Sequence, residues 1–122
     1  MSALPQPSQT ETRLTAMLRS AFKGPVGAAL VADDTIEILA NPDGSVWIEA
    51  AGSGLRRVSE SLGHADRERI IRLVASSVGE ICDQASPIVS AELPGSGERF
   101  EGILPPVSKG PCFAIRKPAH QP

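Results

Sequence analysis

The last third of the chain alternates apolar and polar residues in three short stretches, and this pattern constrains the fold more than any other feature. The stretches are Ile88–Leu93, Arg99–Leu104 and Cys112–Lys117. Such alternation is typical of a strand that buries one face. Glycine-rich residues 95–97 separate the first two stretches, and proline-rich residues 105–111 separate the last two. We therefore predict three strands in this region.

A β-hairpin is predicted upstream, over residues 36–50. Residues 36–38 alternate apolar and acidic side chains, and Val46–Glu49 supplies the returning strand. Between them, Asn41–Gly44 has the composition of a tight turn, because its proline presets the backbone and its glycine closes the turn. A further strand is predicted over Leu55–Val58.

Three helices are predicted from apolar side chains at helical spacing. The first helix follows Ser8–Glu11, which has the spacing of a capping box. Its apolar stripe consists of Leu14, Met17, Leu18 and Ala21. Pro25 suits the first turn of a second, short helix that ends near Ala32. The third and longest helix runs from about Ala65 to Gly79.

The third predicted helix has an apolar face and a charged face. Its predicted buried face consists of Ile70, Leu73, Val74, Ser77 and Val78. Its predicted solvent face consists of Arg67, Glu68, Arg69 and Arg72. These arginines could contact a phosphate backbone, but pairing with carboxylates along an exposed helix is the favoured interpretation. Gly63 and His64 make a poor N-terminal cap for this helix.

The order of elements is helix, helix, three strands, helix, three strands. Helices and strands that segregate in this way favour an α+β fold, with a mostly antiparallel sheet of about six strands and the helices packed on it. A chain of 122 residues fits one domain. We expect this domain to span residues 10–118, between a disordered N-terminal tail of residues 1–9 and a C-terminal tail of residues 119–122.

Composition and charge argue against several classes of function. The formal net charge is −2 and aromatic residues make up 3% of the chain, so neither a positive field nor a stacking platform favours direct nucleic-acid binding. No apolar run approaches the ~20 residues of a membrane helix, so no transmembrane segment is expected. Residues 1–9 lack the features of a signal peptide. The expected location is the cytoplasm.

The two cysteines give no sign of a metal site or a disulfide framework. Cys82 and Cys112 lie far apart and form no CxxC motif, so we interpret them as buried free thiols. An unrelated enzyme with one of them as nucleophile is the weaker alternative, because His64 and His120 lie near neither cysteine in sequence. We therefore predict no catalytic and no metal-binding residue in this chain.

Phosphate loops are missing from the sequence, and two arginines are the remaining candidates for phosphate contacts. Neither Gly52–Gly54 nor Gly95–Gly97 is followed by the lysine of a Walker A motif. Arg99 and Arg116 lie on two of the predicted strands, and a guanidinium offers a permanently charged fork of donors to phosphate. Alone, each is more often a surface ion-pair residue, and Glu98 and Glu101, which flank Arg99, are interpreted as part of a solvated face. Trp47 either covers one end of the core, the favoured interpretation, or faces a neighbouring subunit.

Residues from about Gly24 to Lys117, roughly three-quarters of the chain, resemble the N-terminal domain of the TrbB family of conjugative-transfer ATPases, which are traffic ATPases of type IV secretion systems. The Pro-Pro loop between an arginine strand and an Ile-Arg-Lys strand is the most specific part. The matching segments are Ile38–Gly44 with Val46–Glu49, Ala65–Ala75, Ser86–Pro94, Glu98–Gly102 with Leu104–Pro106, and Ile115–Lys117.

This resemblance implies a ring-forming, nucleotide-capping domain that couples ATP hydrolysis to substrate transfer and pilus assembly. In the family, a separate C-terminal RecA-like domain holds ATP and Mg²⁺, and Arg99 and Arg116 match arginines that contact the nucleotide phosphates. Family members form hexameric rings at the cytoplasmic face of the inner membrane, where they meet other secretion components. Residues 119–122 are then expected to lead towards the ATPase domain.

Without Walker A and Walker B motifs, the chain alone is not expected to hydrolyse ATP or to bind it tightly. An alternative is a truncated, non-catalytic paralogue that acts as a protein-interaction or regulatory module.

Overall fold

The computed structural model describes residues 9–118. The predicted capping residue Ser8, the tail of residues 1–8 and the tail of residues 119–122 lie outside the described residues. Residue 9 already belongs to the first helix. The elements are α1 (Gln9–Ala21), α2 (Gly24–Val31), β1 (Thr35–Ala40), β2 (Val46–Ala50), β3 (Gly54–Arg57), α3 (His64–Ser77), β4 (Ile88–Glu92), β5 (Arg99–Ile103) and β6 (Cys112–Arg116).

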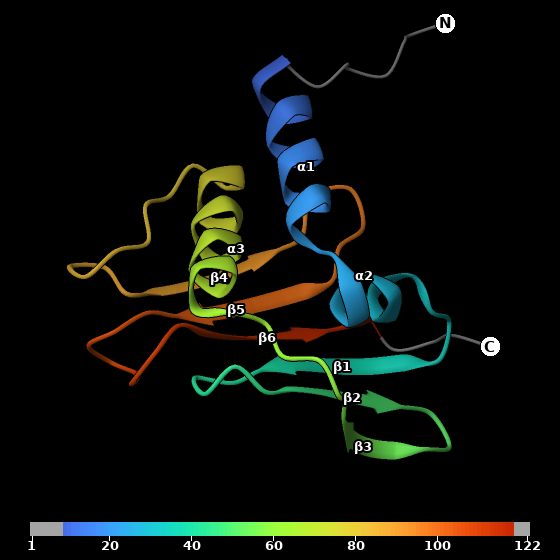
Figure 1. Cartoon of the computed structure of the whole chain (residues 1–122). Helices are drawn as coiled ribbons and strands as arrows, with labels where there is room; N and C mark the ends of the chain where they lie inside the picture. Colours follow the sequence, from blue (N-terminus) through green and yellow to red (C-terminus); the bar gives the residue numbers. More distant parts are fainter. Residues whose placement is uncertain (1–8, 119–122) are drawn as a thin grey trace, which may run out of the picture.

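The strands form one six-stranded sheet in the order β3-β2-β1-β6-β5-β4, and every neighbouring pair is antiparallel. The prediction of an α+β fold with an antiparallel sheet is confirmed. β1 and β6 are the first and the last strand of the chain, yet they pair with each other in the middle of the sheet. The three helices lie on one side of the sheet, and no helix of the described residues covers the other side, here called the open face (Figure 1).

The core fills the space between the helices and the sheet. Phe100 of β5 stacks on Phe113 of β6 with ring centroids 5.2 Å apart. Helix α3 passes so close to β5 that a Cβ atom on Gly102 would lie 2.9 Å from Cγ1 of Ile71, which explains why glycine occupies this position. The larger fully buried core side chains include Ile38, Ile70, Ile71, Leu104, Ile115, Val26, Val46, Val74 and Val89.

The predicted buried face of α3 is confirmed in its middle and wrong at its end. Ile70 and Val74 are fully buried, and Leu73 is partly buried against the core. Val78 is 43% exposed, because the helix ends at Ser77 and Val78 takes the non-helical C-cap position. Gly63 caps the helix without a side-chain hydrogen bond, which agrees with the weak cap that was predicted.

Arg67 of α3 does not face solvent, so the prediction for this residue is wrong. Its side chain is buried, and its three nitrogen groups each donate to a backbone carbonyl. Nε donates to the carbonyl of Pro111 over 2.7 Å, Nη1 to that of Leu62 over 2.6 Å, and Nη2 to that of Pro42 over 2.8 Å. Burial lowers the pKa of the guanidinium, which nevertheless stays charged at neutral pH. One side chain therefore holds three loops together.

Lys117 provides a second polar clamp, directly after β6. Its Nζ donates to the carbonyls of Leu30 and Ala32 over 3.0 and 2.6 Å. These carbonyls lie at the C-terminal end of α2, where helix carbonyls lack intrahelical partners and carry partial negative charge. Lys117 therefore ties α2 to the end of the central strand.

Replacing Arg67 with methionine is expected to lower the free energy of unfolding by about 3 kcal/mol, because three buried or part-buried carbonyls lose their donors. Urea denaturation measures the change. Arg69→Met, an exposed position on the same helix, is the matched control and is expected to stay within ~0.5 kcal/mol of the parent chain. Equal unfolding midpoints for both variants contradict the structural role of Arg67.

Replacing Lys117 with methionine is expected to lower the free energy of unfolding by about 1 kcal/mol, because two carbonyls at the end of α2 lose a charged donor. Hydrogen exchange adds a local readout, since amide protection in α2 is expected to fall more than protection in β4. Lys109→Met, at an exposed loop position, serves as the control. Unchanged protection of α2 contradicts the clamp.

Candidate phosphate-binding arginine pair

The register of β5 and β6 places the two candidate arginines directly opposite each other. Arg99 and Arg116 are Cα partners in the antiparallel ladder. Their neighbours Phe100 and Ile115 are fully buried against the helices, so both arginines project from the open face. Cβ atoms of such partners lie about 4.5–5.5 Å apart. The structure therefore brings together two residues that are 17 positions apart in the sequence.

Each arginine has a carboxylate partner. Nε of Arg116 lies 3.4 Å from Oε2 of Glu37 on β1, and Nε of Arg99 lies 3.9 Å from Oε1 of Glu101 on β5. The arginine side chains are 68% and 69% exposed, and ion pairs this exposed contribute about 0–1 kcal/mol. The guanidinium groups therefore remain accessible to another anion.

A row of charged residues crosses the open face at this level of the sheet. Glu37, Arg116, Arg99 and Glu92 are successive Cα partners on β1, β6, β5 and β4. Two like charges directly opposite each other destabilise an antiparallel pair, and the flanking carboxylates offset this effect. An anion placed between the arginines would offset it as well. The arrangement is therefore suited to hold a phosphate group.

Sequence reasoning identified the two arginines but not Glu37, and it misjudged Glu98. Glu37 belongs to a strand far away in sequence, and only the pairing of β1 with β6 brings it to Arg116. Glu98 was interpreted as part of a solvated face together with Glu101. It is instead buried and accepts a hydrogen bond from the hydroxyl of Ser96. Glu101 does lie on the exposed surface, as expected.

The next row of the open face is less polar. Leu39, Trp47 and Ala114 are half-buried there, on β1, β2 and β6. Trp47 points away from its buried neighbours Val46 and Ile48 and is not part of the core cluster. The interpretation of Trp47 as a core residue is therefore wrong. Its indole lies beside the charged row, on the same face as the arginine pair.

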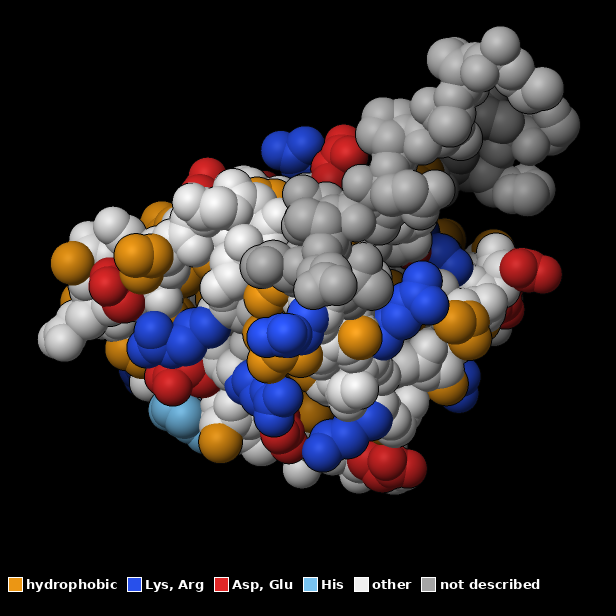
Figure 2. Space-filling view, turned by 90° about the horizontal axis from the view of Figure 1, so that it is seen from above, with side chains coloured by type: hydrophobic (Ala, Val, Ile, Leu, Met, Phe, Trp, Pro, Cys, Tyr) orange, Lys and Arg blue, Asp and Glu red, His pale blue; other side chains and the backbone are white. Residues whose placement is uncertain are grey.

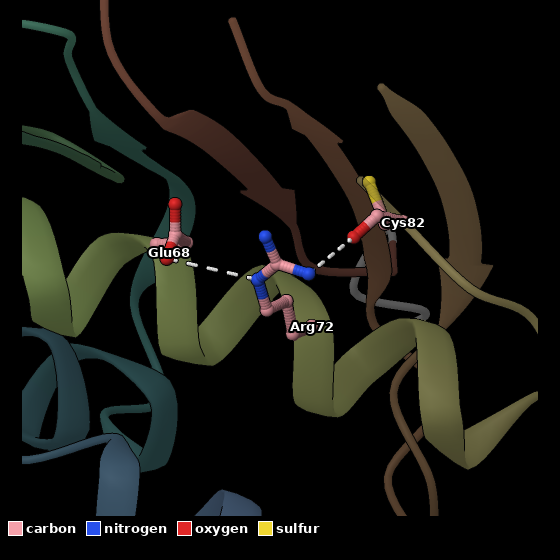
Figure 3. Close-up of polar contacts among 3 residues, drawn as sticks. All are labelled: Glu68, Arg72 and Cys82. Carbon is pink, nitrogen blue, oxygen red and sulfur yellow. Dashed lines mark hydrogen bonds and ion pairs between the residues drawn. The ribbon is translucent and has the colours of Figure 1, made fainter. Parts of the chain in front are cut away.

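Among residues 9–118, the helix side of the molecule offers no comparable pair of arginines. Arg72 of α3 pairs with Glu68 at 3.7 Å and donates to the carbonyl of Cys82 over 3.1 Å (Figure 3). The predicted i,i+4 pairing is thus confirmed for Arg72. Several basic side chains gather near the middle of this face, with acidic side chains beside them and toward its rim (Figure 2).

The cysteines and carboxylates of the described residues do not form a second candidate centre. Cys82 is buried, Cys112 is half-buried, and both are free thiols. Burial raises the pKa of the Cys82 thiol, so little reactive thiolate is present at neutral pH. Within residues 9–118, no group of three histidine, cysteine, aspartate or glutamate residues could hold a metal ion. No helix in the same range is long and apolar enough to cross a membrane.

Comparison with known proteins finds relatives among conjugal transfer proteins. The chain is 39% identical over 111 residues to a probable conjugal transfer protein TrbB of Sinorhizobium fredii. It is 37% identical over the same length to the conjugal transfer protein TrbB of Rhizobium radiobacter. Both alignments cover 91% of this chain but 34% of the relative, so the chain spans about a third of the length of the relatives that it matches.

A solved structure shares the fold. The VirB11 ATPase from the Brucella suis type IV secretion system, determined in complex with sulphate, superposes with a TM-score of 0.79 at 23% sequence identity. The match covers 92% of this chain and 33% of the solved chain. No family model matches the sequence. The chain is therefore a homologue of the conjugal transfer protein TrbB over about a third of that protein's length.

Proposed function

We propose that this chain is the nucleotide-capping domain of a type IV secretion ATPase that serves conjugative transfer. The observation that carries the proposal is the alignment of Arg99 and Arg116 as exposed partners on the open face of the sheet. The homology to TrbB supplies the biological context, and the shared fold with a VirB11 ATPase supports it. In this proposal, ATP and Mg²⁺ are held mainly by a separate RecA-like domain that faces the arginine pair.

The two guanidinium groups give the domain a means to detect the terminal phosphate. Each guanidinium offers several N–H donors to oxygen atoms. Because they lie on one rigid sheet, a phosphate that binds one guanidinium lies within reach of the other. Loss of that phosphate after hydrolysis removes the anion that draws the sheet toward the nucleotide. The domain then moves away, and the motion is passed on to substrate transfer.

The same proposal extends to the assembly. Domains of this kind form a hexameric ring together with the ATPase domains, at the cytoplasmic face of the inner membrane and in contact with other secretion components. Transferred DNA is not a direct ligand of this domain, since the charges of the helix side are mixed and the arginine pair is flanked by carboxylates.

The chain by itself is expected to show no ATP hydrolysis above background, because the described site offers two arginines and no nest of backbone donors for the phosphates. A phosphate-release assay with purified chain and Mg²⁺ measures this. Turnover above that of a heat-denatured sample contradicts the assignment of catalysis to a separate domain.

Joined to the remaining two-thirds of a TrbB relative, the chain provides a test of the arginine pair. Arg99→Ala and Arg116→Ala are each expected to lower kcat for ATP by at least ~10-fold, since each removes a charged donor from the phosphate. Circular dichroism is expected to show an intact fold, because both side chains are exposed.

Arg57→Ala is the matched control, because Arg57 is an exposed arginine on the edge strand β3 of the same sheet. Its ATPase rate is expected to stay within about twofold of the parent fusion. Full activity in Arg99→Ala, in Arg116→Ala and in the double variant contradicts the assignment of this pair to the nucleotide site.

A further inference from the structure

Two carboxylates already pair with the arginines that bind a phosphate in the proposed function. Glu37 contacts Nε of Arg116, and Glu101 contacts Nε of Arg99. With two arginines and two glutamates, the formal charge of this four-residue cluster is zero. Glu92, the Cα partner of Arg99, and Glu49, the Cα partner of Glu37, add negative charge on either side. An incoming phosphate therefore meets two cations that already have carboxylate partners.

The pair formed by Glu37 is the tighter and more shielded of the two. The Glu37 side chain is 25% exposed, against 58% for Glu101, and its contact distance is 3.4 Å against 3.9 Å. Glu37 also has Glu49 as its Cα partner on β2, so a second carboxylate lies on its other side. Glu37 is therefore the main competitor for the guanidinium of Arg116. Arg99 has Glu101 and its Cα partner Glu92 beside it.

We infer that Glu37 and Glu101 are the resting partners of the arginine pair and are exchanged for phosphate, and that Glu37 sets how tightly Arg116 holds it. The inference rests on the proposed function and adds a regulation to that site. Glu37 is a positioning residue, because it acts on the phosphate through Arg116. The exchange is easy in both directions, since an exposed ion pair is weakly held and phosphate is the stronger acceptor for a guanidinium fork.

The charge balance predicts the direction of a substitution at Glu37. Glu37→Gln keeps the size of the side chain and removes one negative charge, so the cluster changes from neutral to a formal charge of about +1. Removing a negative charge that lies a few ångströms from the bound anion is expected to lower the dissociation constant for phosphate by about fivefold in water at low ionic strength. The gain is expected to shrink in high salt, because exposed charges are screened.

An NMR titration tests the inference on the 122-residue chain. The chain is labelled with ¹⁵N at arginine, and inorganic triphosphate is added at low ionic strength while the Nε–H signals of Arg99 and Arg116 are followed. Wild type is expected to bind weakly, and Glu37→Gln to lower the dissociation constant by about fivefold. A merely structural role for Glu37 predicts weaker binding or no change, so tighter binding is a specific readout.

Glu68→Gln is the matched control. It makes the same change of charge and breaks an ion pair of similar length, that of Glu68 with Arg72 at 3.7 Å on the helix side (Figure 3). Its dissociation constant is expected to stay within about twofold of wild type, because only nearby charge acts strongly at the site. Urea denaturation checks that both variants stay folded.

The outcomes separate the inference from the proposed function. If triphosphate shifts both arginine signals but Glu37→Gln binds no more tightly than Glu68→Gln, the proposed role of Glu37 is contradicted and the phosphate site is supported. If triphosphate shifts neither arginine signal in wild type or in Glu37→Gln, the proposed phosphate site itself is contradicted. Tighter binding by Glu37→Gln alone, lost again in Glu37→Gln with Arg116→Gln, supports both.

Discussion

The pairing of β1 with β6 is the contact on which the rest of this structure depends. It joins the sheet half built from the first three strands to the half built from the last three. Each end of this β1–β6 pair is held by a buried or half-buried cation. Arg67 binds the carbonyls of Pro42 and Pro111, just beyond the end of β1 and just before the start of β6, and Lys117 binds the end of α2 at the opposite end.

The same pairing of β1 with β6 creates the candidate site. Arg116 lies on β6 between two neighbours, with Arg99 on one side and Glu37 on the other. Because side chains alternate along a strand, a register slip by one residue in β6 would turn Arg116 towards the helices and bury its charge. The core residues Ile115 and Phe113 oppose such a slip, since they would move to the open face. Packing of the core therefore fixes the position of the arginine.

Local patterns were sufficient to predict most elements of this fold, but not their long-range partners. The alternation of Ile88–Leu93, Arg99–Leu104 and Cys112–Lys117 predicts the strands and puts both arginines opposite in phase to the core residues. No local pattern shows that β1 pairs with β6, so Glu37 could not be assigned to Arg116. Arg67 was misjudged because its charge matches that of Arg69 and Arg72, while its burial depends on three carbonyls, two of which belong to loops far away in sequence.

The central claim is that the open face of the sheet meets the terminal phosphate of a nucleotide through its two arginines. The most direct measurement is a crystal structure of the chain joined to the rest of a TrbB relative, with a non-hydrolysable ATP analogue bound. The account predicts both guanidinium groups about 3 Å from terminal phosphate oxygens, with Arg116 released from Glu37. A bound nucleotide whose phosphates contact neither arginine, with the open face turned to solvent, would contradict it.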